Sequence, residues 1–206
     1  NAKVFKMNFK NLPRVTSGLL IVSLYVAAIS GLGQNYEALE PYFISWYVDQ
    51  GLSEVRQGQF WRLITPIFIH FGLMHLAFNL TMTWQFGELL ERSMGPGRFS
   101  VLVLVLALSS NLAQFYTSGP AFGGLSGVLY GLFGYFWIIS KLNPRFGYQI
   151  NPTAVKMLLV WFALGWFNFF GLLGDIHIAN MAHTGGLLMG MLLAYLQSVA
   201  GSTTSS

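Results

Sequence analysis

A serine and a histidine in two separate apolar segments are the residues best suited to do chemistry. Ser126 stands between glycines in the segment Gly124–Gly127, at the start of an apolar run, and His183 lies in a later glycine-containing run. Such a serine can pack backbone to backbone against another helix, or it can be a nucleophile held at the start of a helix. If His183 reaches it, the pair can carry out acyl transfer, with the imidazole taking the hydroxyl proton.

The composition places both residues in a membrane protein. The chain has 206 residues, of which 54% are hydrophobic and 9% are charged, whereas roughly 25% of the residues are charged in an average soluble domain. It has no cysteine, which excludes disulfides, thiolate nucleophiles and cysteine-ligated metals. The net charge of +4 does not indicate a nucleic-acid partner, because the basic residues are scattered at the ends of apolar segments.

We expect an all-α membrane protein, a single domain over residues 1–206 built as a bundle of six transmembrane helices. A span needs roughly 20 apolar residues, and the expected spans are roughly 15–32, 70–90, 99–117, 124–141, 156–173 and 178–198. The linker 33–69 is rich in aromatic residues, which favours a long structured loop at the membrane surface between the first two helices. Residues 200–206 are expected to be a disordered tail, and the start at Asn1 rather than Met is consistent with a missing N-terminal stretch.

The basic residues predict the orientation of these spans. Nine of the eleven precede the first span, separate the second from the third, or surround the loop between the fourth and fifth. The positive-inside bias therefore places both termini in the cytoplasm and the 33–69 linker outside. Ser126, His183, His75 and Asn79 then lie at similar depth in the outer half of the membrane, which favours one polar site.

Small residues predict how the fourth and sixth spans meet. They recur every four positions as Gly123, Gly127 and Gly131 in the fourth span and as Ala182, Gly186, Gly190 and Ala194 in the sixth. Stripes of this kind let two helix backbones approach closely. If the two spans pack through them, Ser126 and His183 come within hydrogen-bond reach, about 2.6–3.2 Å.

Donors for an oxyanion are present near this pair. His75 and Asn79 are four residues apart and share one face of the second span. Together with the backbone amide of Ser126 at a helix start, they could donate hydrogen bonds to a developing negative charge. No acidic third member is apparent, because Asp175 lies eight residues before His183 and the other carboxylates lie in the linker or toward the cytoplasm. We therefore expect a dyad oriented by packing, not a triad.

Taken together, these motifs resemble the rhomboid family of intramembrane serine proteases, in its bacterial form. The resemblance extends from about Trp61 to Leu196. It rests, in chain order, on Trp61-Arg62, His75 to Asn79, Gly119 to Gly127, and Ala182-His183 followed by Gly186 and Gly190. A glycine-flanked serine alone is a weak signal, whereas this set of motifs on the expected spans is a strong one.

The resemblance implies roles for individual residues. The Ser126–His183 dyad would lie in a water-filled cavity open to the outside, with His75 and Asn79 assisting the oxyanion. Tyr130 would pack against the His183 ring. The glycines expected to support the site are Gly124, Gly127 and Gly186.

The resemblance also implies a substrate class and a setting. Substrates would be transmembrane proteins in the lipid bilayer, cut near the outer face at a small residue where the helix unwinds. Phe78 and Trp161 would form a gate for lateral access near the second and fifth spans. The protein would be a multi-pass protein of the bacterial cytoplasmic (inner) membrane, with no cofactor and no metal.

Two other functions are compatible with the same segments. Six spans and buried histidines could form a proton relay in a small transporter, but the acidic residues of such relays and the inverted repeats of many transporters are lacking. The second is a non-catalytic relative that binds transmembrane helices without cutting them, and the presence of both Ser126 and His183 disfavours it. A metal site is disfavoured because the histidines lack a closely spaced ligand set.

Overall fold

The computed structural model describes residues 12–143, 146–167 and 178–203, and all regular structure within these ranges is helical. The α-helices are α1 (Arg14–Ile29), α2 (Tyr36–Leu39), α3 (Ser53–Arg56), α4 (Leu73–Met94), α5 (Pro96–Ser118), α6 (Ser126–Leu142), α7 (Pro152–Trp166) and α8 (Asn180–Thr203). Short 3₁₀-helices lie at Glu40–Tyr42, Phe60–Leu63 and Thr65–Phe68. The expectation of an all-α fold is confirmed.

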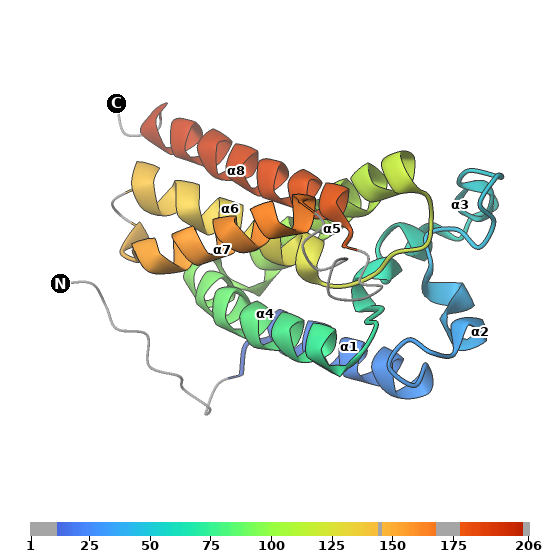
Figure 1. Ribbon diagram of the computed structural model, residues 1–206. Helices are drawn as coiled ribbons and strands as arrows, with labels where there is room; N and C mark the ends of the chain where they lie inside the picture. The colour runs from blue at the N-terminus through green and yellow to red at the C-terminus, as the bar shows by residue number, and fades with distance from the viewer. Residues whose placement is uncertain (1–11, 144–145, 168–177, 204–206) are drawn as a thin grey trace.

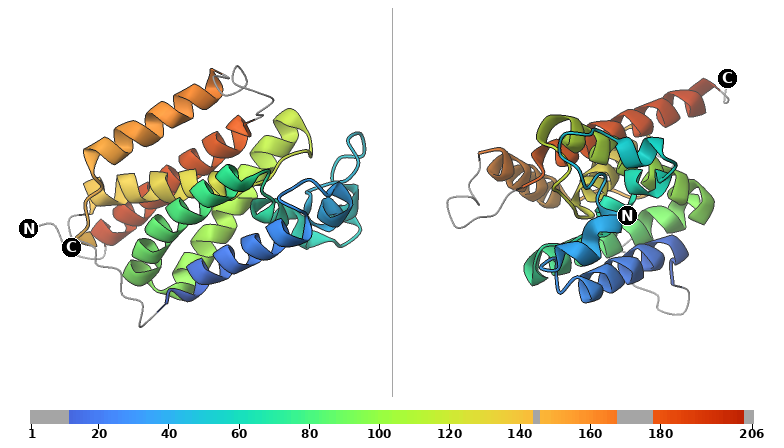
Figure 2. Two further views of the ribbon diagram at one scale, coloured as in Figure 1. Left: turned by 60° about the horizontal axis from the view of Figure 1, so that its bottom comes forward. Right: turned by 90° about the vertical axis from the view of Figure 1, so that its right-hand side faces the viewer.

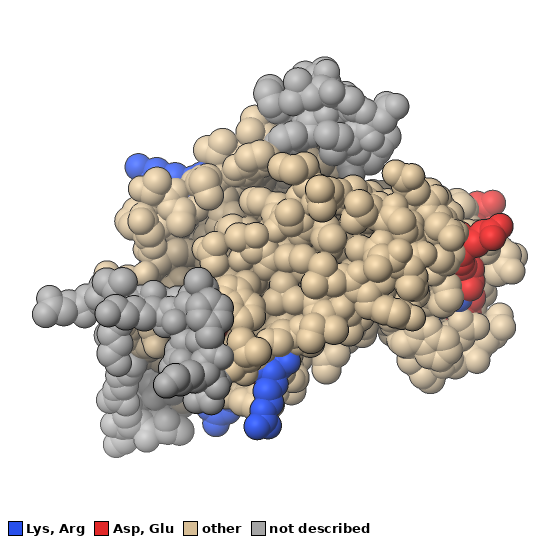
Figure 3. Space-filling model, turned by 90° about the horizontal axis from the view of Figure 1, so that it is seen from below, with Lys and Arg blue, Asp and Glu red and all other residues tan. Residues whose placement is uncertain are grey.

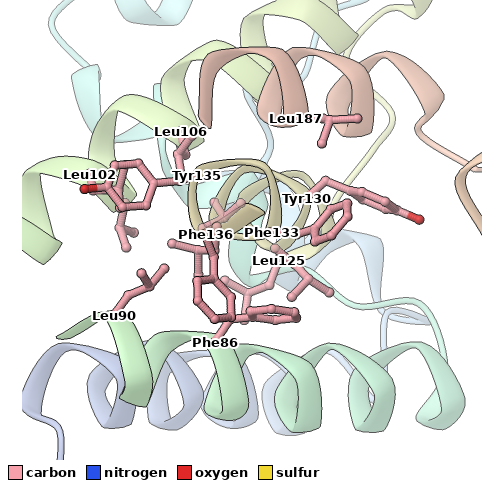
Figure 4. Close-up of a cluster of buried hydrophobic side chains, with 14 of the residues drawn as sticks. Phe86, Leu90, Leu102, Leu106, Leu125, Tyr130, Phe133, Tyr135, Phe136 and Leu187 are labelled. Atoms are coloured by element: carbon pink, nitrogen blue, oxygen red, sulfur yellow. The ribbon is translucent and has the colours of Figure 1, made fainter. Parts of the chain in front are cut away.

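Helix α6 forms the centre of the bundle, with α4, α5 and α8 packed around it (Figures 1 and 4). Every residue from Gly127 to Phe136 is buried, as expected of a helix that is apolar on all sides. Phe86 of α4, Leu106 of α5 and Leu187 of α8 point toward it (Figure 4). The candidate nucleophile therefore begins the helix that the rest of the fold encloses.

The remaining long helices lie further out. α1 packs on α4, and α7 lies at the periphery, set apart from the other helices (Figure 2). α1 begins and α8 ends at one end of the bundle, while α2 and α3 lie at the opposite end (Figure 1).

Several helix ends differ from the expected spans. α1 stops at Ile29 instead of continuing to 32, because Gly31 and Leu32 both take positive φ angles that end the helix. α7 covers Pro152–Trp166, earlier than the expected 156–173, of which residues 168–173 lie outside the described ranges. α8 continues to Thr203, so the tail expected to be disordered from residue 200 is helical over 200–203.

The charged side chains and the lengths of the apolar helices both bear on whether the bundle spans a membrane. Acidic side chains gather at the end that carries α2 and α3, and most visible basic side chains lie at the other end (Figure 3). Among the described residues, α5 is the one helix long and apolar enough to cross a membrane by length and composition, and α1 and α7 are shorter apolar helices.

The segment 33–69 is held together by a buried arginine and is attached to the bundle by an asparagine of α5. The side chain of Arg62 is only 3% exposed and forms an ion pair with Glu40. Its Nη1 also donates to the carbonyl oxygen of Phe43 at 3.0 Å. From α5, the Asn111 side chain donates to the carbonyl oxygen of Leu63 at 2.8 Å. The segment is thus a structured element attached to α5.

The start of α1 is capped from another helix. Glu91, near the end of α4, accepts hydrogen bonds from the backbone amides of Val15 at 3.0 Å and Thr16 at 2.8 Å, and from the Thr16 hydroxyl at 2.8 Å. The first amides of a helix lack partners within it, and α1 begins after Pro13, which offers no side-chain cap. Glu91 supplies both the missing acceptor and a favourable negative charge.

We expect Glu91→Gln to destabilise the fold by about 1–3 kcal/mol, because hydrogen bonds to a charged acceptor are replaced by weaker ones to a neutral amide. Unfolding in mixed micelles by a denaturing detergent would measure the change. Glu37→Gln, at an exposed position in α2, is the matched control and should leave stability unchanged. Equal stability of the two variants would contradict the assigned capping role.

Candidate active site

Ser126 and His183 meet at the N-terminal ends of two neighbouring helices. Ser126 is the first residue of α6, and His183 lies in the first turn of α8. Nε2 of His183 lies 2.8 Å from Oγ of Ser126, and both residues are half-buried. The arrangement lets the imidazole take the hydroxyl proton, and the position at a helix N-terminus favours negative charge on the serine.

The two helices approach this closely because glycines of α8 lie against the backbone of α6. A methyl group on Gly186 would collide with the carbonyl oxygen of Gly127, and one on Gly190 with that of Gly131. The expected small-residue packing of these helices is therefore present. The stripe differs at its start: Gly123 precedes α6 and packs on Ile69, where an added Cβ would lie 2.5 Å from Ile69 Cβ.

The loop before Ser126 is held by groups from the 33–69 segment and its continuation. The Gly124 amide donates to the carbonyl oxygen of Pro66 at 3.0 Å. The Leu125 amide points to Nε2 of the fully buried His70 at 3.5 Å, while Nδ1 of His70 lies 3.1 Å from the carbonyl oxygen of Phe68. Both contacts are satisfied if Nδ1 carries the proton. His70 is absent from the predicted site, and nothing in its apolar sequence context indicates this position.

His75 lies directly beside the serine loop. A Cβ built on Gly124, whose φ is +122°, would lie 2.8 Å from Nε2 of His75 and 3.7 Å from Ser126 Oγ. The imidazole fits there because residue 124 has no side chain. The Phe71 amide donates to Nδ1 of His75 at 3.4 Å, which assigns the proton to Nε2. An N–H donor therefore faces the space next to the serine oxygen.

Asn79 lies one turn further along α4 and is almost fully buried. Its Nδ2 donates to the carbonyl oxygen of His75 at 2.9 Å, which uses one of the two amide hydrogens. Its Oδ1 is buried without a hydrogen-bond partner among the described residues. The second N–H of this amide is thus the group left for a further acceptor.

The His183 ring is held by packing. Its centroid lies 4.7 Å from that of Tyr130, one turn after the serine. The Tyr130 ring in turn contacts Phe162 of α7 edge-on, with centroids 5.5 Å apart, and its hydroxyl donates to the carbonyl oxygen of Leu158 at 3.4 Å. Within the described residues no carboxylate hydrogen-bonds to His183. Asp175 lies outside the described ranges.

Gln114 fixes the start of α8 just before the histidine. Its Oε1 accepts hydrogen bonds from the backbone amides of Met181 and Ala182, both at 3.1 Å. This glutamine near the end of α5 caps the helix that carries His183. The sequence could have indicated Gln114 only as a polar side chain at the end of an apolar run. The predicted site does not include it.

The two predicted gate residues touch each other. The rings of Phe78 on α4 and Trp161 on α7 have centroids 6.2 Å apart, and both side chains are exposed. They bridge the peripheral α7 to the bundle on the side of α4, away from the seam between α6 and α8.

Comparisons of the sequence with known proteins all indicate one family. The family model described as Rhomboid domain matches residues 57–199. The chain is 38% identical to proteins named Rhomboid protease GlpG from two strains of Klebsiella pneumoniae, over 159 residues that cover 77% of this chain and 55% of each relative. It is also 38% identical to the protein of that name from Salmonella choleraesuis, over 76% of this chain and 54% of the relative. The chain spans about half the length of the curated relatives it matches.

We expect Gly186→Ala to slow the reaction of Ser126 with a fluorophosphonate by about 10²-fold, since a displacement of about 1 Å at a reacting pair can have that effect. The added methyl pushes α8 away from the Gly127 carbonyl and moves His183 off the serine. Gly18→Ala, in α1 where an added Cβ meets nothing within 4 Å, is the control and should react normally. An unchanged rate in Gly186→Ala would refute the role of the glycine seam.

Proposed function

Because this chain belongs to the rhomboid family, we propose that it is a serine endopeptidase that cuts transmembrane helices of other proteins within the bilayer. The observation that carries the proposal is the 2.8 Å contact between Ser126 Oγ and His183 Nε2. A hydroxyl at a helix start and an imidazole nitrogen at this distance have the geometry of an activated nucleophile.

In the proposed mechanism, His183 takes the proton of Ser126 as the serine oxygen attacks the carbonyl carbon of the scissile peptide bond. The proton then passes from His183 to the leaving amine, and the acyl group stays on the serine. A water molecule next gives a proton to His183 and attacks the acyl carbon. The bond from that carbon to the serine oxygen then breaks, His183 returns its proton to the serine oxygen, and the new carboxyl group is released. Tyr130 keeps the imidazole ring in place through these steps.

The tetrahedral intermediate carries a negative oxygen that needs donors. The Ser126 amide belongs to the first turn of α6, whose N–H groups have no acceptor within the helix. The Nε2–H of His75 and the remaining N–H of Asn79, both on α4, are the side-chain donors that we propose for this oxygen. Donors held in place before the reaction stabilise developing charge without having to reorganise.

We further propose six membrane spans formed by α1, α4, α5, α6, α7 and α8. The opposite placement of acidic and basic side chains along the bundle supports this topology (Figure 3). The positive-inside bias then places both termini in the cytoplasm of a bacterium and the 33–69 segment outside its inner membrane. The dyad lies toward the end of the bundle where that segment packs.

Transmembrane helices would be cut near the outer face, at small residues where the helix unwinds. The peptide groups of a helix are hydrogen-bonded to one another, and in lipid they cannot be left without partners. The scissile segment would therefore unwind at the half-buried dyad, outside the lipid. We propose that substrates enter laterally between α4 and α7. The contact between Phe78 and Trp161 supports this route, because a small, exposed contact between two rings would be easy to separate.

We expect both Ser126→Ala and His183→Ala to abolish cleavage of a fluorescent transmembrane substrate by protein reconstituted in liposomes. Each variant loses one half of the proton-transfer pair. Fluorophosphonate labelling should disappear in Ser126→Ala, while substrate binding persists in both variants. Wild-type protein that binds the substrate without cleaving it would favour a non-catalytic binding relative. Proton-coupled flux that survives Ser126→Ala would favour a transporter.

We expect His75→Ala to lower kcat by about 10²–10³-fold with a smaller change in KM, as for the loss of one oxyanion donor. The His75 ring lies beside Gly124, and in the proposed mechanism it donates to the oxyanion, so its removal would act on the transition state. Thermal unfolding of the variant separates this effect from loss of the fold. A proportional rise in KM at constant kcat would instead indicate a role in substrate binding.

A further inference from the structure

A cavity of about 310 Å³ opens between α5, α6 and α8 at the end of the bundle opposite the dyad. Its walls are mostly apolar and include Val101 and Val105 of α5 and Leu193 of α8. Arg98 and Gln197 line it near the start of α5 and the end of α8. This volume is at the lower end of the range of ligand sites, roughly 300–1,000 Å³.

The cavity exists because α5 and α8 are packed differently at their two ends. Near the dyad, a Cβ added to Gly185 of α8 would lie 2.8 Å from the Cβ of Ala113 of α5, so small residues let the backbones approach. At the other end the facing residues are larger, and they leave a groove between the helices whose floor includes Tyr135 of α6.

One charge at the groove has no hydrogen-bond or ion-pair partner in the described part of the chain. Arg98 is exposed and forms no hydrogen bond or ion pair with any residue that the structure describes. The other polar groups of the wall satisfy each other, because the Tyr135 hydroxyl donates to Oε1 of Gln197. The groove therefore presents an apolar channel with a single free guanidinium at its mouth.

We propose that this groove binds an anionic phospholipid, with the phosphate at Arg98 and part of one acyl chain along Val101, Val105 and Leu193. Arg98 and Val105 are seven residues apart in α5, which corresponds to about 10 Å along the helix. A headgroup at Arg98 thus leaves about that length of groove for the chain. Arg98 lies at the basic end of the bundle, where the proposed orientation puts the cytoplasmic leaflet. A basic pocket between helices on that side suits an anionic headgroup.

The site is independent of the dyad, so it can be tested on purified full-length chain carrying Ser126→Ala. Native mass spectrometry would measure binding of phosphatidylglycerol and of phosphatidylcholine with identical acyl chains. We expect phosphatidylglycerol to bind about fivefold more tightly, the factor given by one basic side chain near an anionic headgroup. Arg98→Gln should remove this preference, and because the exposed side chain forms no hydrogen bond or ion pair with a described residue, we expect the fold to be unaffected.

Two further variants test the charge and the groove separately. Lys141→Gln removes an exposed cation outside the groove, whose Nζ lies 4.9 Å over the Trp137 ring, and should keep the fivefold preference. Val101→Trp fills the groove from a position that is 61% exposed and should weaken binding of both lipids. The proposal is overturned if Arg98→Gln keeps the preference, if Lys141→Gln loses it, or if Val101→Trp binds both lipids normally. Competition by inorganic phosphate alone at equal concentration would also overturn it, since an acyl chain would then contribute nothing.

Discussion

The contact on which the site depends is the approach of two helix backbones with no side chain between them. Gly186 and Gly190 of α8 lie against the backbone of Gly127 and Gly131 of α6, and a methyl added to either α8 glycine would meet a carbonyl oxygen. Apolar side chains cannot drive helices together in lipid as they do in water, so close backbone packing must hold them. This seam sets the depth and angle at which the first turn of α8 passes the first turn of α6. The distance between Ser126 and His183 follows from it.

Hydrogen bonds to backbone groups position the two segments that carry the dyad, the start of α8 and the loop before α6. Gln114 holds the start of α8, and the Pro66 carbonyl holds the loop that ends at Ser126. Arg62 in turn holds together the segment that contains Pro66, and Asn111 of α5 ties that segment to the bundle. The irregular backbone near the site is thus satisfied by protein groups, as it must be where water is scarce.

Sequence patterns anticipated those parts of the structure that depend on local composition or on repeats along one helix. The apolar runs predicted the long helices, and the four-residue spacing of small residues predicted the close packing of α6 and α8. Helix ends were less predictable: Leu32 leaves the helix through a positive φ that its residue type does not signal. Gly123 continues the spacing of the stripe but lies in a loop, because α6 begins only at Ser126.

The positioning contacts could not be predicted because each joins residues distant in sequence. Gln114 contacts amides 67 and 68 residues later, and His70 reaches an amide 55 residues later. Each is a single polar residue whose partner is a backbone group, so no pair of residue types reveals it. The same holds for the Gly124 position, where the need for glycine arises from an imidazole on another helix.

The cap on α1 has a consequence for how the chain assembles during synthesis. The amide of Thr16 finds its acceptor on Glu91, 75 residues later. While the ribosome is still making the intervening residues, the leading turn of α1 has no protein acceptor and must be hydrated or bonded to lipid headgroups. Helix α1 is therefore fixed in register only after α4 emerges, and a nascent chain that ends before Glu91 would leave α1 free to slide along its own axis.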